Sequence, residues 1–220
     1  MKIATRTILL AAASMAILSG GSAAMASGHL DTGSAAPSTL MVTVADTEAG
    51  ASAKQFITKM GERGINFLGD TSKSQEAKKA EFSKLLNDSF DMNTIARFTL
   101  GTYWKSATAA QQQEYLKLFK KMIVNVYSKR FSDYEGQKFD VRSASVDGKD
   151  TTVTSYIVPG NGPEVRVDWR VRQKDGGYKV VDIIVEGVSM AMTQRSDFAS
   201  VIQRGGGNVE SLLTHLRGQQ

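Results

Sequence analysis

The chain has 220 residues, with 27 basic and 22 acidic side chains, 41% hydrophobic residues and no cysteine. This length favours one domain with a full hydrophobic core, and the lack of cysteine excludes disulfides and zinc sites built from His and Cys. The excess of positive charge is small and no run of basic residues concentrates it, which argues against nucleic-acid binding.

The first 26 residues have the pattern of a secretory signal peptide. Lys2 and Arg6 form the positive start, residues 8–18 form an apolar run, and Ala24-Met25-Ala26 is a small-x-small cleavage site. The run is shorter than the roughly 20 residues that a membrane span needs. We therefore predict cleavage and export to the periplasm; the alternative is an uncleaved N-terminal anchor. These 26 residues carry two of the basic side chains and no acidic one, so the mature charge is +3.

Composition divides the remainder into a leader and one domain. Residues 27–50 are rich in Ser, Ala, Gly and Thr, which predicts a disordered leader without a site. Residues 51–220 are predicted to form a single α+β domain, which starts with an apolar pattern of helical spacing. Ser72 and Gln75 have the spacing of a capping box for a second helix. Asp91 is a suitable N-cap for a short third helix.

The most amphipathic segment follows Thr108 and Gln111, which form a second capping box. It predicts the longest helix of the chain, over residues 109–134. Its apolar stripe is wide enough to contact both a core and something else. The stripe consists of Tyr115, Leu116, Phe119, Met122, Ile123, Val126, Tyr127, Phe131 and Tyr134.

After Gly136 the hydrophobic period changes from 3.6 to 2, which predicts strands. The first begins at Phe139, and Asp147-Gly148 separates it from a second over residues 151–158. A third strand alternates Val165, Val167, Trp169 and Val171 with charged residues, which is typical of a sheet with one buried face. The fourth covers residues 178–186.

The connections between these strands are short, which favours antiparallel hairpins. Two closing helices are predicted, near residues 197–203 and 209–217, the second capped by Asn208. Helices, then strands, then helices is the order of an α+β fold with helices packed on one face of an antiparallel sheet.

Residue types give little support for catalysis. His29 lies in the leader, so His215 is the only histidine left for a Ser-His-Asp triad. Residues 205–207 are glycines but lack the Lys and the preceding strand of a phosphate loop. Asp168 and Asp182 could face each other and act as acid and base, although buried carboxylates are more often structural. We predict no catalytic residue, no metal and no cofactor.

Two segments resemble a known family. The first is FDMNTIARFTLGTYW over residues 90–104, and the second is VVDIIVEGVS over residues 180–189. The second is followed by Arg195-Ser196-Asp197-Phe198 and by a helix carrying leucines near residue 213. Together they resemble the MlaC-type proteins, also called toluene-tolerance auxiliary transport proteins, which are periplasmic phospholipid carriers.

The resemblance implies an NTF2-like sheet with helices that enclose an apolar cavity for acyl chains. It also implies three partners: phospholipid, an inner-membrane ABC transporter complex and an outer-membrane lipid-handling complex. A monomer is expected. The alternatives are a small enzyme of the isomerase or dehydratase type on the same scaffold, which would use Asp168 or Asp182, and a periplasmic binder of another apolar solute or of a partner protein.

The resemblance and the wide helical stripe together suggest which side chains surround the cavity. Arg97 is expected at the rim, near the phosphate of the head group. The residues expected to contact lipid are Phe98, Tyr103, Phe119, Ile123, Val126, Tyr127, Val167, Trp169, Val181, Ile183 and Val185.

Overall fold

The computed structural model describes residues 44–219, so the predicted signal peptide and most of the predicted leader lie outside the described residues. The helices that precede the sheet are α2 (Val44–Gly69), α3 (Gln75–Ser89), α4 (Met92–Leu100), α5 (Tyr103–Ser106) and α6 (Ala109–Ser128). Because α2 begins at Val44, the last residues of the predicted leader are helical. Within residues 44–219 no helix is both long enough and apolar enough to cross a membrane.

A five-stranded sheet follows, in the order β1-β2-β3-β4-β5 with every neighbouring pair antiparallel. Its strands are β1 (Lys138–Asp147), β2 (Asp150–Val158), β3 (Val165–Lys174), β4 (Gly177–Val185) and β5 (Val188–Ser189). Helices α7 (Met190–Arg204) and α8 (Val209–Gly218) close the chain. The predicted α+β class with an antiparallel meander is confirmed, although the short β5 was not predicted.

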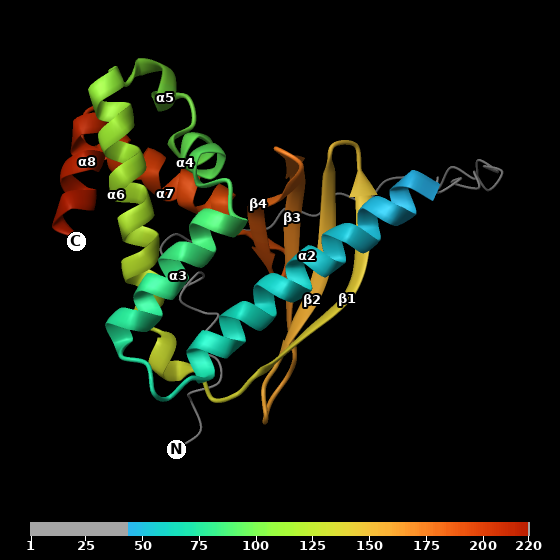
Figure 1. Ribbon diagram of the computed structural model, residues 1–220. Helices are drawn as coiled ribbons and strands as arrows, with labels where there is room; N and C mark the ends of the chain where they lie inside the picture. The colour runs from blue at the N-terminus through green and yellow to red at the C-terminus, as the bar shows by residue number, and fades with distance from the viewer. Residues whose placement is uncertain (1–43, 220) are drawn as a thin grey trace, which may run out of the picture.

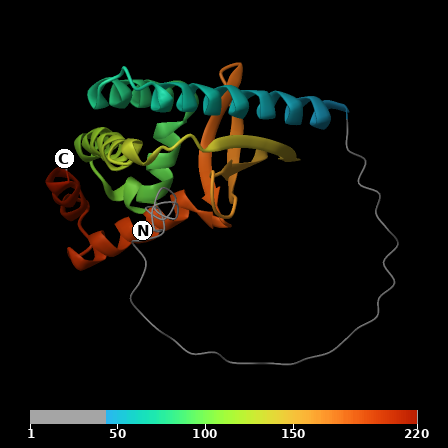
Figure 2. The ribbon, with the colours of Figure 1, turned by 90° about the horizontal axis from the view of Figure 1, so that it is seen from below.

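The helices divide into two groups around this sheet. Helix α2 runs across it over β1 and β2, whereas α3, α4 and α7 contact β4 (Figures 1 and 2). Two separate clusters of buried side chains result. The sheet cluster contains Ala53, Ile57, Met60, Phe67, Leu85, Phe131, Val153, Val171 and Val180. The helical cluster contains Ala96, Leu100, Ala107, Tyr115, Phe119, Met122, Phe198, Ile202, Val209, Leu212, Leu213 and Leu216.

Side-chain caps set the starts of most helices. The Thr108–Gln111 capping box and the Asn208 cap are present as predicted. The predicted Ser72 cap of α3 is wrong: Ser74 caps the helix by accepting a hydrogen bond from the Ala77 amide at 3.1 Å. Ser72 instead donates a hydrogen bond to Asp70. An N-cap must directly precede the first helical residue, a position that Ser74 occupies.

Helix α6 is shorter than predicted, since it ends at Ser128 and not at residue 134. A 3-10 turn, η2 (Phe131–Asp133), follows and directs Phe131 into the sheet cluster. There the Phe131 ring packs edge-on against Phe67 and Phe82, with centroid distances of 6.0 and 5.4 Å. Phe131 therefore belongs to a different cluster from Tyr115, Phe119 and Met122 of α6. At 26 residues, α2 is the longer helix.

Helix α7 begins at Met190, seven residues before the predicted start, and Ser189 caps it by accepting from the Met192 amide. A tight turn with positive φ at Glu186 (49°) and Gly187 (82°) leads into it. The cap was missed because no Glu or Gln stands three residues after Ser189 to complete a capping box.

Three glycines, Gly50, Gly61 and Gly64, interrupt the interior of α2, and each costs about 1 kcal/mol relative to alanine in a helix. At Gly61 the cause is Phe139 of β1, because a Cβ atom there would lie 2.2 Å from a carbon of its ring. The bare backbone of Gly61 therefore lets α2 pack directly on that ring.

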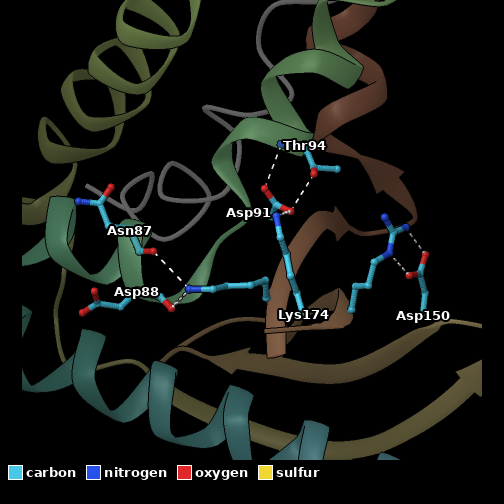
Figure 3. A network of polar contacts seen from close by, with 8 residues as sticks. Asn87, Asp88, Asp91, Thr94, Asp150 and Lys174 are labelled. Carbon is cyan, nitrogen blue, oxygen red and sulfur yellow. Dashed lines mark hydrogen bonds and ion pairs between the residues drawn. The ribbon is translucent and has the colours of Figure 1, made fainter. Parts of the chain in front are cut away.

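A polar joint ties the helical group to the sheet at Asp91, and Figure 3 shows its side-chain contacts with Thr94 and Lys174. The Asp91 amide donates to the Val180 carbonyl at 3.0 Å, and the Asp91 carboxylate caps α4 by accepting from Thr94. Lys174 Nζ, from β3, donates to the same carboxylate at 2.7 Å. Burial by itself raises the pKa of Asp91, but the hydrogen bonds from Lys174 and Thr94 lower it more. The pKa of Asp91 therefore lies below its ordinary value.

Replacing Asp91 by Ala removes the cap and leaves Lys174 unpaired, so the free energy of unfolding is expected to fall by about 2–3 kcal/mol. Lys174→Met is expected to cost about 1 kcal/mol or less, because Lys174 is largely solvent-exposed. Urea denaturation measures both free energies of unfolding.

The folded-state pKa of Asp91 is lowered. The stabilisation that its carboxylate gives to the fold is therefore complete above the unfolded pKa, about 3.9, and is lost as pH falls through the folded pKa. Equal free energies of unfolding for wild type and Asp91→Ala at neutral pH would show that the hydrogen bonds of Asp91 do not stabilise the fold.

Candidate binding cavity

A cavity of about 1340 Å³ lies between the sheet cluster and the helical cluster. Its walls include members of both: Met60, Phe67, Leu85 and Phe131 from the first, and Phe119, Met122 and Phe198 from the second. The volume exceeds the roughly 300–1,000 Å³ of ordinary small-molecule pockets. The hollow therefore has room for a ligand larger than a typical metabolite.

Eight of the predicted contact residues line this cavity. Helix α6 contributes Phe119, Ile123, Val126 and Tyr127, and strands β3 and β4 contribute Val167, Trp169, Ile183 and Val185. Register explains why the strand residues share a face, since Val167 pairs with Val185 and Trp169 with Ile183. The apolar stripe of α6 contributes to both the core and the cavity wall. Tyr115 is fully buried in the core, whereas Val126 is 42% exposed.

The other four predicted residues lie outside the cavity lining. Arg97 stacks over Trp104, with its Cζ atom 5.0 Å from the ring centroid, and Arg195 covers Phe98 in the same way at 5.2 Å. Tyr103 packs against the helical cluster.

Val181 is the fourth, and a β-bulge explains its position. Arg170 pairs with Asp182 but the next residue, Val171, pairs with Val180, so Val181 has no partner on β3. The extra residue changes the alternation of β4. Val180 is therefore the residue that enters the sheet cluster, where it is fully buried.

Helices α2 and α7 form two of the walls that were not predicted. Helix α2 provides Met60, Gly61, Gly64, Ile65, Phe67 and Leu68, and helix α7 provides Met190, Ala191, Thr193, Gln194, Asp197, Phe198, Ser200, Val201 and Arg204. The late predicted start explains only the missed residues before Asp197, because the predicted helix already contains Asp197, Phe198 and Val201. For α2, the signal in the sequence is an apolar pattern of helical spacing that glycines interrupt.

Most polar groups in the walls are satisfied by the walls themselves. Trp169 Nε1 donates to Ser155 Oγ at 2.8 Å, and Thr99 Oγ1 and Tyr115 Oη share a hydrogen bond of 2.8 Å. In the part of the chain that the structure describes, no buried side-chain nitrogen or oxygen lacks a partner. Asp197 also lines the cavity, and burial raises its pKa. The walls consequently present mainly carbon atoms to a ligand.

Neither aspartate proposed for acid–base chemistry is free to act in the hollow. Asp168 pairs with Ile184 and Asp182 with Arg170, so the two carboxylates do not oppose each other. Asp168 is bound by Thr154 and Arg166 and lies outside the lining. Asp182 borders the cavity, but it forms a second joint between β4 and the helices. Its carboxylate accepts from the amides of Ile183 and Ala191 and from Ser189 Oγ. Across residues 44–219, no three potential ligands of a metal ion come together.

The comparisons with known proteins agree with this geometry. The family model described as "MlaC protein" matches residues 61–218. The chain belongs to the MlaC family.

Two relatives carry names that bear on the cavity. The toluene tolerance protein ttg2D of Pseudomonas putida is 25% identical over 161 residues, which cover 69% of this chain and 75% of that protein. The intermembrane phospholipid transport system binding protein MlaC of Haemophilus influenzae is 27% identical over 123 residues, or 54% of this chain and 56% of that protein.

A solved structure shares the fold. It is a phospholipid-binding protein from Ralstonia solanacearum in complex with a phospholipid, with a TM-score of 0.67 and 23% identity. The match covers 76% of this chain and 96% of that one. At this identity the likeness establishes the architecture of the domain, not its ligand.

The cavity walls can be tested with single charges. Val126→Arg and Ile183→Arg are each expected to reduce phospholipid uptake from liposomes at least about tenfold, because an unpaired guanidinium against acyl chains costs several kcal/mol. The matched control is Val188→Arg, since Val188 is 51% exposed and outside the lining. Circular dichroism verifies folding. Normal uptake by the two folded wall variants would show that these side chains do not contact lipid.

The structural role of Asp182 gives a separate expectation. Asp182→Asn keeps one acceptor oxygen but loses the charge, so the free energy of unfolding is expected to fall by about 2 kcal/mol. Lipid uptake is expected to stay within about twofold of wild type at a temperature where the variant is folded. Thermal unfolding and an uptake assay measure the two quantities. A stable variant that loses a biological function while it still loads lipid would instead favour acid–base chemistry at this residue.

Proposed function

We propose that this chain carries phospholipid across the periplasm with the acyl chains inside the cavity. The observation that supports it most is a hollow of about 1340 Å³ with apolar walls between two separately packed clusters. Membership of the MlaC family supports the same function. So does the Ralstonia structure, which shares this fold and holds a phospholipid.

The size of the hydrophobic effect explains why a carrier is needed. Each buried methylene is worth about 0.8 kcal/mol, so an acyl chain of about fifteen carbons costs about 12 kcal/mol to expose to water. A cavity as apolar as the bilayer interior removes this cost during the crossing. Transfer between membrane and protein is then close to neutral in free energy, which permits both loading and release.

The chemistry of the walls points in the same direction. They present mainly carbon atoms to the hollow. Water is a poor filler because a water molecule needs several polar partners. A flexible apolar ligand fills such a space at the least cost.

The head group is proposed to lie near the cations of the lining. Lys129 and Arg130 follow the end of α6, and Arg204 ends α7. All three border the cavity, whereas Arg97 does not. A lipid phosphate near these side chains would stay in contact with solvent, which avoids the cost of burying its charge.

The proposed location and partners follow from the family and the N-terminal sequence. The pattern of residues 1–26 supports export to the periplasm. The Haemophilus relative is named as the binding protein of an intermembrane phospholipid transport system. We accordingly propose that this chain exchanges lipid with an inner-membrane ABC transporter complex and an outer-membrane lipid-handling complex.

Native mass spectrometry of the protein purified from periplasm tests the function directly. The expected result is an added mass equal to one or more phospholipids, identified after solvent extraction. After gentle delipidation, the protein is expected to regain that mass when incubated with phospholipid liposomes. A folded protein that carries no lipid and takes none up would contradict the proposal. A different apolar molecule in its place would favour the binder of another solute.

A further inference from the structure

Helix α2 presents one row of side chains to the cavity with a gap in the middle. Met60, Gly64 and Leu68 are spaced four residues apart, so they lie on the same side of the helix, and all three line the cavity. The outer two have long apolar side chains. Gly64 exposes bare helix backbone between them.

The other glycines near this row have neighbours in the protein, but Gly64 does not. A Cβ atom at Gly61 would clash with Phe139, and one at Gly69 would meet a Tyr134 ring carbon at 3.6 Å. A Cβ atom at Gly64 would meet no atom within 4 Å outside the local helix. Alanine would fit there without strain and is a better helix former. Packing within the chain therefore gives no reason for glycine at this position.

We infer that Gly64 is a specificity-determining residue: it forms a notch in which an acyl chain lies against the α2 backbone, and the notch sets the length of chain that the cavity accepts. This inference rests on the proposed function, because it assigns part of the same cavity to the ligand. The notch lies between Met60 and Leu68, one helical turn from Gly61, where α2 packs closely on the Phe139 ring. A side chain at position 64 would occupy space that the ligand now uses.

The effect can be scaled from the transfer free energy of hydrocarbon. Excluding one methylene from the cavity changes relative uptake about fourfold. A leucine side chain takes the place of several such groups. Gly64→Leu is therefore expected to lower the uptake of stearoyl lipid relative to myristoyl lipid by at least about tenfold.

The experiment uses the full mature chain and phosphatidylglycerol liposomes with equal amounts of myristoyl, palmitoyl and stearoyl species. Delipidated wild type, Gly64→Ala, Gly64→Leu and the control Asn66→Leu are incubated with them, and native mass spectrometry reports the bound species. Asn66 is exposed on the same helix and lies outside the cavity lining. The control is expected to match wild type.

A shift toward myristoyl lipid in Gly64→Leu, with a smaller shift in Gly64→Ala, would support the inference. If Gly64→Leu does not fold, the Gly64→Ala result decides, because alanine meets no atom of the protein. Unchanged chain preference in the folded variants would overturn the notch while leaving the carrier function intact. Failure of wild type to load any lipid would overturn the function and the notch together.

Discussion

Two apolar surfaces that face each other across water attract, so a hollow between them persists only if something holds them at a distance. In this protein β4 carries hydrogen bonds that join the sheet cluster to the helical cluster. The Val180 carbonyl accepts from the Asp91 amide, and the Asp182 carboxylate accepts from the Ala191 amide. Hydrogen bonds are directional and short in range. They fix the separation of the clusters, which non-directional apolar contacts would not do.

The walls and the joints therefore have different physical tasks. The joints are polar, and Asp91 and Asp182 are both buried. The walls are mainly carbon, and their buried polar atoms already have partners within the protein. An acyl chain that enters or leaves breaks no hydrogen bond with the walls. Its binding depends on volume and on the area removed from water, which is consistent with a carrier that must release its cargo.

The parts of the fold that could be predicted are those encoded by local pattern. The α6 stripe and the β3 alternation depend on residues close in sequence, and six of the contact residues that they indicate line the cavity. Two of the errors come from tertiary packing. The break after Ser128 serves to place Phe131 beside Phe67 and Phe82, which are distant in sequence. The bulge at Val181 depends on a pairing with β3 that a single strand does not reveal.

Which side chains line the cavity was harder to predict than which segments resemble the family. The polar joints explain this difference. Residues 90–104 and 180–189, which carry the family resemblance, also carry the groups that bond β4 to the helices. Asp91 belongs to the first segment, and Val180, Asp182 and Ser189 belong to the second. A polar joint requires particular atoms at particular places, so it leaves a recognisable sequence. A wall that contacts hydrocarbon requires only an apolar surface of suitable volume, which many side chains provide. The recognisable segments therefore contain the polar joints together with some wall residues, such as Ile95 and Ile183, whereas the walls from α2 and α7 emerge only from tertiary packing.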